Sequence, residues 1–326
     1  MNSPRDPPVL SPQSAAAAPT WRAAYSDRTA ALMAAFSQLA YVPFETGVVV
    51  AADAASGAPE EVSGRRQLRG LLGAGSFQLL ATFNSDDTQA YLATRPDQFS
   101  VLAFRGTTDL RDWETNARIG RKVFHSNVPL NRGRRRLERG AAPEVYVHEG
   151  FLHAYEVCGD AIATAVNTAI PADRGLYITG HSLGGALAQI ASAILERDTL
   201  AACYTYGSPR VGTAAFDRVV KCPHYRGINN WDIVPGVPLE TPWGYQHSGD
   251  PRLLVPAQEG RAALRRDRNP VIRIGVDIFA FAVSLMGEGV FVVDDHMIWN
   301  YREKLERIAA FRDRRAAANR PLRPSA

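Results

Sequence analysis

Residues Leu176–Ala191 read L-Y-I-T-G-H-S-L-G-G-A-L-A-Q-I-A. The apolar start predicts a β-strand that stops at Gly180, and the small residues that follow predict a helix from Leu183. Between the two lies the pattern G-x-S-x-G, centred on Ser182. On a sharp strand-to-helix turn, glycines two positions before and after a serine remove steric clashes and expose its hydroxyl, and the N–H groups of the next helix point at the same place. We therefore interpret Ser182 as a catalytic nucleophile, with an ordinary glycine-rich turn as the alternative.

A serine nucleophile needs a base and an acid, and in hydrolases with this turn the chain order is serine, acid, histidine. Three histidines follow Ser182. His224 opens a predicted strand, far from that strand's reactive end, which favours a structural role. His247 lies between two strand-like runs and is an alternative base. We favour His296, because it lies on an exposed connection before the terminal helix, where a side chain can turn into the site.

The favoured acid is Asp232. It comes directly after the predicted strand His224–Asn229, and the carboxyl ends of parallel strands carry the functional groups of open α/β sheets. The remaining acids that we weighed have ordinary positions in a predicted helix, in a polar loop or at the cap of the terminal helix: Asp217, Asp250, Asp294 and Asp295.

The oxyanion of an acyl-transfer reaction needs two hydrogen-bond donors. One expected donor is the backbone N–H of Leu183, directly after the nucleophile. The other is expected from Arg105-Gly106-Thr107, which follows the predicted strand Phe99–Phe104. Gly106 permits a close approach, and Thr107 offers a backbone N–H and a hydroxyl. A plain turn is the alternative interpretation of this loop.

Strands and helices alternate over most of the chain, which predicts an α/β fold with a mostly parallel central sheet flanked by helices. We expect residues 1–20 to be a disordered, proline-rich leader, residues 21–312 a single domain, and residues 313–326 a basic tail. Residues 51–76 are expected to form a loop with one helical turn. Arg252–Pro256 and Val271–Ile274 are expected to pair as a hairpin. The apolar run Val276–Val293 contains charges and glycines, so we expect a buried helix or a lipid-facing cap rather than a membrane span.

Composition and charge limit the classes of protein to which the chain can belong. The chain has 326 residues, 46% of them hydrophobic, and a net charge of +4. This is enough apolar material for a large core, and the chain shows no basic-aromatic module of the kind that binds nucleic acid. The three cysteines have no metal-ligand spacing, and the start of the chain has no apolar signal region. We therefore expect reduced, buried thiols in a cytoplasmic protein, with a Cys203–Cys222 disulfide and export without a Sec signal as alternatives. We expect no metal and no organic cofactor.

A set of motifs in fixed order resembles the class 3 lipase family, the fungal triacylglycerol lipase type of α/β-hydrolase. The motifs are Phe104-Arg105-Gly106-Thr107, Asp112-Trp113, Val147-His148-Glu149-Gly150-Phe151, Gly180–Ala186, Tyr206–Gly212, Asn230-Trp231-Asp232-Ile233-Val234-Pro235 and Asp295-His296.

The resemblance covers about Phe77 to Tyr301. It implies a Ser182–Asp232–His296 triad, with Thr107 and Leu183 in the oxyanion hole. It also implies a lid in the segment that contains Trp113, a structural role for His148, and a family-variable insertion near the acyl-binding face at Val276–Val293.

The resulting hypothesis is a serine carboxylester hydrolase, a lipase that cleaves acylglycerol or related lipid esters at a membrane or droplet surface through an acyl-enzyme. A phospholipase A1 or a small-ester esterase is the alternative enzyme, because the triad does not distinguish them. The basic loop Arg132–Arg139 mildly favours anionic lipids. The alternative outside catalysis is a silent lipid-binding protein on the same fold.

Overall fold

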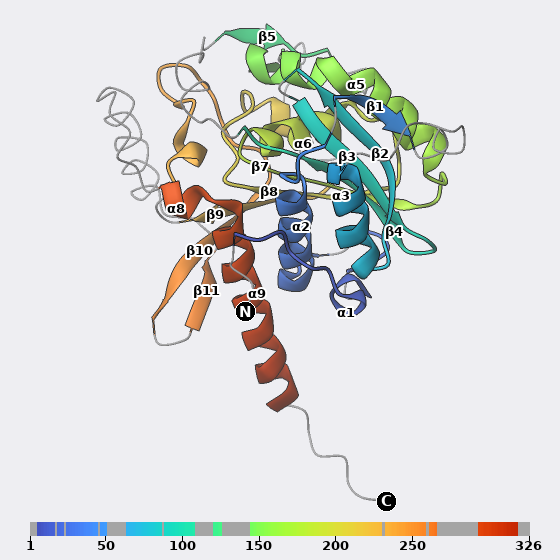
Figure 1. The fold of residues 1–326 in the computed structure, drawn as a ribbon. Coiled ribbons are helices and arrows are strands. Elements are labelled where there is room, and N and C mark those ends of the chain that lie inside the picture. Colours follow the sequence, from blue (N-terminus) through green and yellow to red (C-terminus); the bar gives the residue numbers. More distant parts are fainter. Residues whose placement is uncertain are drawn as a thin grey trace, which may run out of the picture.

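One sheet organises the part of the chain that the computed structural model describes, which is residues 5–16, 18–22, 24–44, 46–50, 63–86, 88–107, 120–125, 144–229, 232–258, 261–265 and 293–318. Its nine strands lie in the order β1-β2-β3-β4-β7-β8-β9-β10-β11 (Figure 1). Their bounds are β1 Gly47–Val50, β2 Gln78–Ser85, β3 Thr88–Arg95, β4 Phe99–Phe104, β7 Gly175–His181, β8 Leu200–Tyr206, β9 His224–Asn229, β10 Asp250–Gln258 and β11 Arg261–Arg265. Two short strands, β5 Arg121–Val123 and β6 Tyr146–His148, pair separately.

The centre of the sheet is parallel, as the alternation of strands and helices predicts. Strands β4, β7, β8, β9 and β10 pair in parallel, while β1 to β4 pair as antiparallel neighbours at one edge and β10 with β11 at the other. The carboxyl ends of the parallel strands therefore meet along one edge of the sheet, where functional groups of an α/β fold gather.

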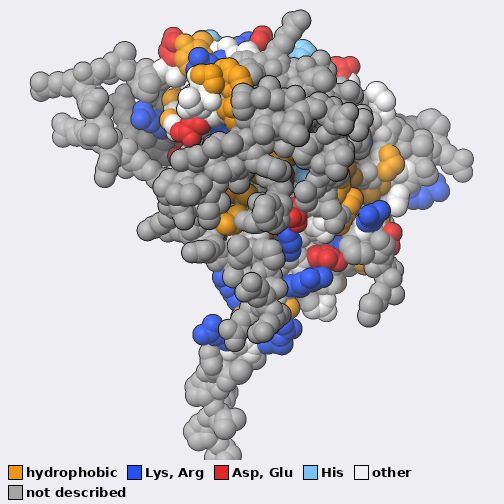
Figure 2. Space-filling model, turned by 90° about the vertical axis from the view of Figure 1, so that its left-hand side faces the viewer, with side chains coloured by type: hydrophobic (Ala, Val, Ile, Leu, Met, Phe, Trp, Pro, Cys, Tyr) orange, Lys and Arg blue, Asp and Glu red, His pale blue; other side chains and the backbone are white. Residues whose placement is uncertain are grey.

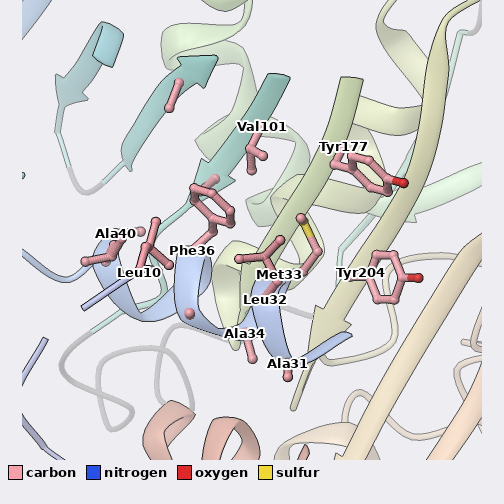
Figure 3. Packing of buried hydrophobic residues seen from close by; sticks show 14 of the residues in the cluster. Leu10, Ala31, Leu32, Met33, Ala34, Phe36, Ala40, Val101, Tyr177 and Tyr204 are labelled. Carbon is pink, nitrogen blue, oxygen red and sulfur yellow. The ribbon is translucent and has the colours of Figure 1, made fainter. Parts of the chain in front are cut away.

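Helices cover both faces of the sheet. On one face lie α5 Glu149–Ala169 and α6 Leu183–Ile194, and on the other lie α2 Asp27–Leu39, α3 Ser63–Ala74 and α9 Ile298–Ala318 (Figure 1). The pleat divides the strands between two cores: Val101 and Tyr177 pack with the α2 side, whereas Leu102 and Ile178 pack with the α5 and α6 side. Figure 3 shows the first core, in which buried α2 side chains lie beside Val101, Tyr177 and Tyr204.

Helix α2 is held at its N-terminal end. Its N-cap is Ser26, whose hydroxyl accepts from the backbone N–H of Thr29. Near the same end, Arg28 contacts Asp313 of α9 at 2.5 Å, and Arg312 of α9 pairs with Asp27. Lys and Arg side chains gather at the lower end of the molecule in Figure 2, where α9 projects from the body. The two ion pairs hold α9 against α2. They therefore also hold α8 Val293–His296, the helix that precedes α9.

Residues 5–16 and 18–20 differ from the expected disordered leader. They include helix α1 Pro12–Ala16, and the side chains of Leu10 and Ala15 are buried in the core. Arg95 donates to the backbone oxygen of Pro12, and Gln38 donates to that of Asp6. The prolines fix the backbone without preventing burial, so the few apolar residues between them supply enough contact to order the segment.

Two other expectations about local structure were wrong. Helix α3 occupies residues that we expected to be a loop, because Leu68 and Leu72, four positions apart, are fully buried on one face. The hairpin partner of β10 is β11, after a short connection, rather than Val271–Ile274. The helical pattern of α3 was missed because Arg and Gly residues interrupt its apolar positions. Strand β11 was missed because it is short and has an arginine at each end.

Two further expectations concerned the state of the cysteines and the presence of a membrane-spanning helix. Cys158, Cys203 and Cys222 are free and buried, which agrees with reduced thiols. Over the described residues, no helix has both the length and the apolar character that crossing a bilayer requires. The run Val276–Val293, apart from Val293 at the start of α8 Val293–His296, lies outside the described residues.

Candidate active site

Ser182 lies on the turn between β7 and α6, with φ 56° and ψ −129°. A non-glycine residue at positive φ is strained and persists only where the surrounding structure fixes it. The flanking glycines make the turn possible. A Cβ at Gly180 would overlap the backbone oxygen of Gly184, and a Cβ at Gly184 would overlap the backbone oxygen of Phe104. The G-x-S-x-G spacing is therefore a packing requirement at this corner of the sheet.

The side chains of Asp232 and His296 meet, although 64 residues separate them. Nδ1 of His296 lies 2.8 Å from Oδ2 and 2.9 Å from Oδ1 of Asp232. A carboxylate can only accept, so Nδ1 carries the proton and Nε2 is the basic nitrogen. Nε2 is buried, and it has no hydrogen-bond partner among the described residues. This is the tautomer that a general base needs.

Two further donors hold Asp232, which is 2% exposed. The hydroxyl of Tyr301 donates to Oδ2 at 2.6 Å, and the backbone N–H of Val234 donates to Oδ1 at 2.9 Å. The Tyr301 oxygen also accepts from the backbone N–H of Asn229 at 3.0 Å. Burial, together with the neighbouring carboxylate, raises the pKa of Tyr301 well above its usual value, so the hydroxyl stays a donor. Tyr301 could not be predicted from the sequence, because no pattern in it shows that α9 passes the end of β9.

The loop after β4 packs directly against the serine turn. A Cβ at Gly106 would lie 2.6 Å from the backbone oxygen of His181 and 3.0 Å from Cβ of Ser182. Only glycine allows this approach, and it brings Thr107 to the site. On the other side of Ser182, Leu183 opens α6, whose first N–H groups have no partner within the helix. Both residues predicted for the oxyanion hole therefore flank the serine turn, and their role stays a prediction.

A cavity of about 300 Å³ opens beside the candidate base. Its lining combines Thr107, His181 and His296 with residues of the N-terminal segment, α2, the residues after α2, α3, the link before α9, and α9: Arg5, Pro7, Gln38, Tyr41, Val42, Pro43, Gln67, Met297, Ile298 and Trp299. The Arg5 guanidinium lies 5.7 Å from the Trp299 ring centre. The N-terminal part of this lining, Arg5 and Pro7, was not predicted, because the sequence analysis expected residues 1–20 to be disordered.

The three other histidines that the sequence analysis considered have structural partners. Nε2 of His247, the alternative base, lies 2.7 Å from the backbone oxygen of Pro235, so it donates there. His224 lies between Ser248 and Thr205, and burial lowers its pKa to about 3. The ring of His148 stacks on Phe151, with 4.2 Å between ring centroids, and burial lowers its pKa to about 4.

The remaining acids with described side chains also have other partners. Asp217 accepts from the backbone N–H of Gly249, Asp250 pairs with Arg252, and Asp295 pairs with Lys304 at 2.9 Å.

Two predicted features lie outside the described residues: Trp113, which we assigned to a lid, and the basic loop Arg132–Arg139. Their predicted roles stay predictions. Among the described residues, no group of three or more His, Cys, Asp or Glu side chains has the arrangement of a metal site.

Comparison with known proteins gives a family for the central part of the chain. Residues 101–241 match the family model of lipase (class 3). The chain is 36% identical over 166 residues to the secreted mono- and diacylglycerol lipase 1 of Fusarium solani, covering 49% of this chain and 45% of that protein. It is 31% identical over 177 residues to a Rhizomucor miehei lipase, covering 50% and 44%. The matches thus span less than half the length of either relative.

A solved structure extends the similarity to the fold. The lipase from Rhizopus microsporus var. chinensis matches with a TM-score of 0.51 and 26% identity, over 81% of this chain and 84% of that one. The relatives also correct one expectation: the expected cytoplasmic location was wrong, since the Fusarium relative is named as a secreted lipase. Buried thiols behave as small apolar groups, so three reduced cysteines do not indicate in which cellular compartment a protein works. The central region, residues 101–241, thus belongs to the class 3 lipase family, and the chain has the α/β-hydrolase fold of the fungal lipases.

Proposed function

We propose that the protein is a serine carboxylester hydrolase that cleaves acylglycerols or related lipid esters. One observation carries the proposal. His296 donates through Nδ1 to a buried Asp232 carboxylate and keeps Nε2 unpaired among the described residues, on the same cavity as Thr107. The names of the relatives, lipases that include a mono- and diacylglycerol lipase, support the substrate class.

In the proposed reaction, Nε2 of His296 takes the proton of the Ser182 hydroxyl as Oγ attacks the ester carbonyl. The backbone N–H groups of Leu183 and Thr107 stabilise the oxyanion, and each such donor is worth about 2.7–4 kcal/mol of transition-state stabilisation. Asp232 orients the imidazolium, which then protonates the leaving alcohol. Water, activated by the same base, releases the acyl group and restores the serine. Every step uses a side chain, a backbone group or water.

A panel of esters tests the proposal. Wild type and Ser182→Ala are compared on triacylglycerols, diacylglycerols, phospholipids and p-nitrophenyl esters, below and above the concentration at which each substrate aggregates. We expect hydrolysis of acylglycerols by wild type and a loss of at least 1,000-fold in Ser182→Ala. Equal hydrolysis rates in the two proteins would rule out Ser182 as the nucleophile, and lipid binding without hydrolysis would leave the silent lipid-binding protein as the function. Preference for phospholipids would indicate the phospholipase A1 alternative.

The same panel addresses where the enzyme acts. We infer an extracellular enzyme that works at a lipid–water interface, in line with the secreted relative. A rise in rate at the aggregation limit supports a working lid in the segment with Trp113, and a rate without such a step speaks against it. We also infer that residues 21–312 form one catalytic domain, and that the described residues before Trp21 pack against its core.

A further inference from the structure

The residue before the nucleophile, His181, has partners on both sides of the candidate site. Its side chain is 3% exposed. Nε2 lies 2.6 Å from the backbone oxygen of His296, and Nδ1 lies 2.6 Å from the hydroxyl of Tyr41. The rings of His181 and His296 have centroids 4.6 Å apart. The middle position of G-H-S therefore contacts the backbone of the base-bearing segment, in addition to its chain neighbour Ser182.

The chemistry of these contacts sets the direction of each hydrogen bond. A backbone oxygen can only accept, so Nε2 of His181 carries the proton and donates to His296. In a neutral imidazole Nδ1 is then the acceptor, and the Tyr41 hydroxyl is the donor. Burial lowers the pKa of His181 well below its usual value, with the neighbouring His296 acting in the same direction, so the neutral form that this arrangement needs is the stable one.

Tyr41 extends the network to the predicted oxyanion loop. Its hydroxyl faces Gly106 so closely that a Cβ at that position would overlap it, and a backbone hydrogen bond from Gly106 reaches the same oxygen. Tyr41 lies two residues after the end of α2, which packs on the sheet beneath the site. A continuous path thus runs from Gly106 through Tyr41 and His181 to the backbone of His296.

We propose that His181 and Tyr41 are positioning residues that hold the base-bearing segment and the oxyanion loop in one fixed arrangement around Ser182. The proposal rests on the proposed function, since it assigns a task within that reaction. Neither side chain needs to touch the substrate. Their hydrogen bonds fix the backbone at His296 and at Gly106, and transition-state stabilisation depends on the placement of both within fractions of an ångström.

Tyr41→Phe is the sharpest test, because it removes one oxygen atom and keeps the ring. Its matched control is Tyr91→Phe. The Tyr91 hydroxyl is also buried and donates to a backbone oxygen of α2, Phe36 O, at 2.9 Å, but it lies outside the site. We expect both variants to lose similar thermal stability. We expect only Tyr41→Phe to lose kcat on a soluble p-nitrophenyl ester, by about 10-fold with KM little changed, as befits the loss of about one hydrogen bond in the reacting geometry.

His181 gives a second comparison. His181→Phe keeps a flat ring and removes both hydrogen bonds, and we expect a loss of about 100-fold in kcat. His181→Gln restores a donor toward the His296 oxygen and is expected to recover part of that loss. If His181→Phe does not fold, Tyr41→Phe still decides the question.

The rate at which a soluble fluorophosphonate modifies Ser182 separates this inference from the proposed function. We expect a fast reaction in wild type and in Tyr91→Phe, and a slower one in Tyr41→Phe. A wild type that does not react overturns the proposed function, and this inference with it. A reactive wild type together with a Tyr41→Phe variant that reacts and turns over at the wild-type rate overturns the positioning role alone.

Discussion

Gly207 lies against the Asp232–His296 pair, and replacing it with alanine should disable the site without dismantling the fold. It follows β8 and has φ +55°. A Cβ there would lie 2.5 Å from Oδ2 of Asp232 and 3.1 Å from Nδ1 of His296. Ordinary contact begins near 3.4 Å, so the carboxylate has to move by about 0.9 Å. A misplacement of about 1 Å costs on the order of 100-fold in rate, and we expect that loss in kcat/KM for Gly207→Ala.

The backbone strain of this substitution has a matched control. Gly244 also has positive φ, +72°, but a Cβ there would meet only Nη1 of Arg121, at 3.5 Å. Gly244→Ala should therefore lose about 1–3 kcal/mol of unfolding free energy from strain alone and keep its activity. The assays are hydrolysis of a soluble p-nitrophenyl ester and urea unfolding. If Gly207→Ala is as active as Gly244→Ala, the assignment of Asp232 and His296 to the reaction is refuted.

Two further predictions concern stability. Tyr301→Phe removes a donor from the buried Asp232 carboxylate and leaves a backbone N–H unpaired, so urea unfolding should show a loss of about 1.5–3 kcal/mol; an unchanged midpoint would contradict that hydrogen bond. Burial lowers the pKa of His148 to about 4 and of His224 to about 3. Between pH 6.5 and the folded pKa the unfolded chain binds more protons than the folded chain. Each histidine therefore costs no stability above pH 6.5 and lowers the free energy of unfolding by about 1.4 kcal/mol per pH unit from there down to its folded pKa. Urea unfolding at pH 7.5 and 5.5 should show the decrease, and equal stability at both values would contradict it.

Much of the site could be predicted because its signals are local or follow a fixed order along the chain. G-x-S-x-G reports a packing constraint within five residues, and the structure shows that constraint at Gly180 and Gly184. The order of serine, acid and histidine restricted the search to a few residues, and Asp232 and His296 do meet. The parallel centre of the sheet followed from the alternation of strands with helices, which leaves few other topologies.

The supporting residues could not be predicted, because their partners are distant in the sequence. Tyr301 reaches Asp232 across 69 residues, and Tyr41 reaches His181 across 140. Contacts between residues so far apart leave no periodic pattern in the sequence. The N-terminal segment was missed for another reason: its proline content resembles that of disordered chains, while its ordering depends on the burial of a few side chains such as Leu10.

The central claim is that Ser182 is the nucleophile of an ester hydrolase, and covalent labelling tests it most directly. Wild type and Ser182→Ala are treated with a fluorophosphonate, digested, and analysed by mass spectrometry. The account predicts one phosphonyl adduct, on the peptide that contains Ser182, with loss of esterase activity in proportion to labelling and no adduct in Ser182→Ala. An adduct on another residue that accompanies the loss of activity, or an active enzyme that takes no adduct at Ser182, would contradict it.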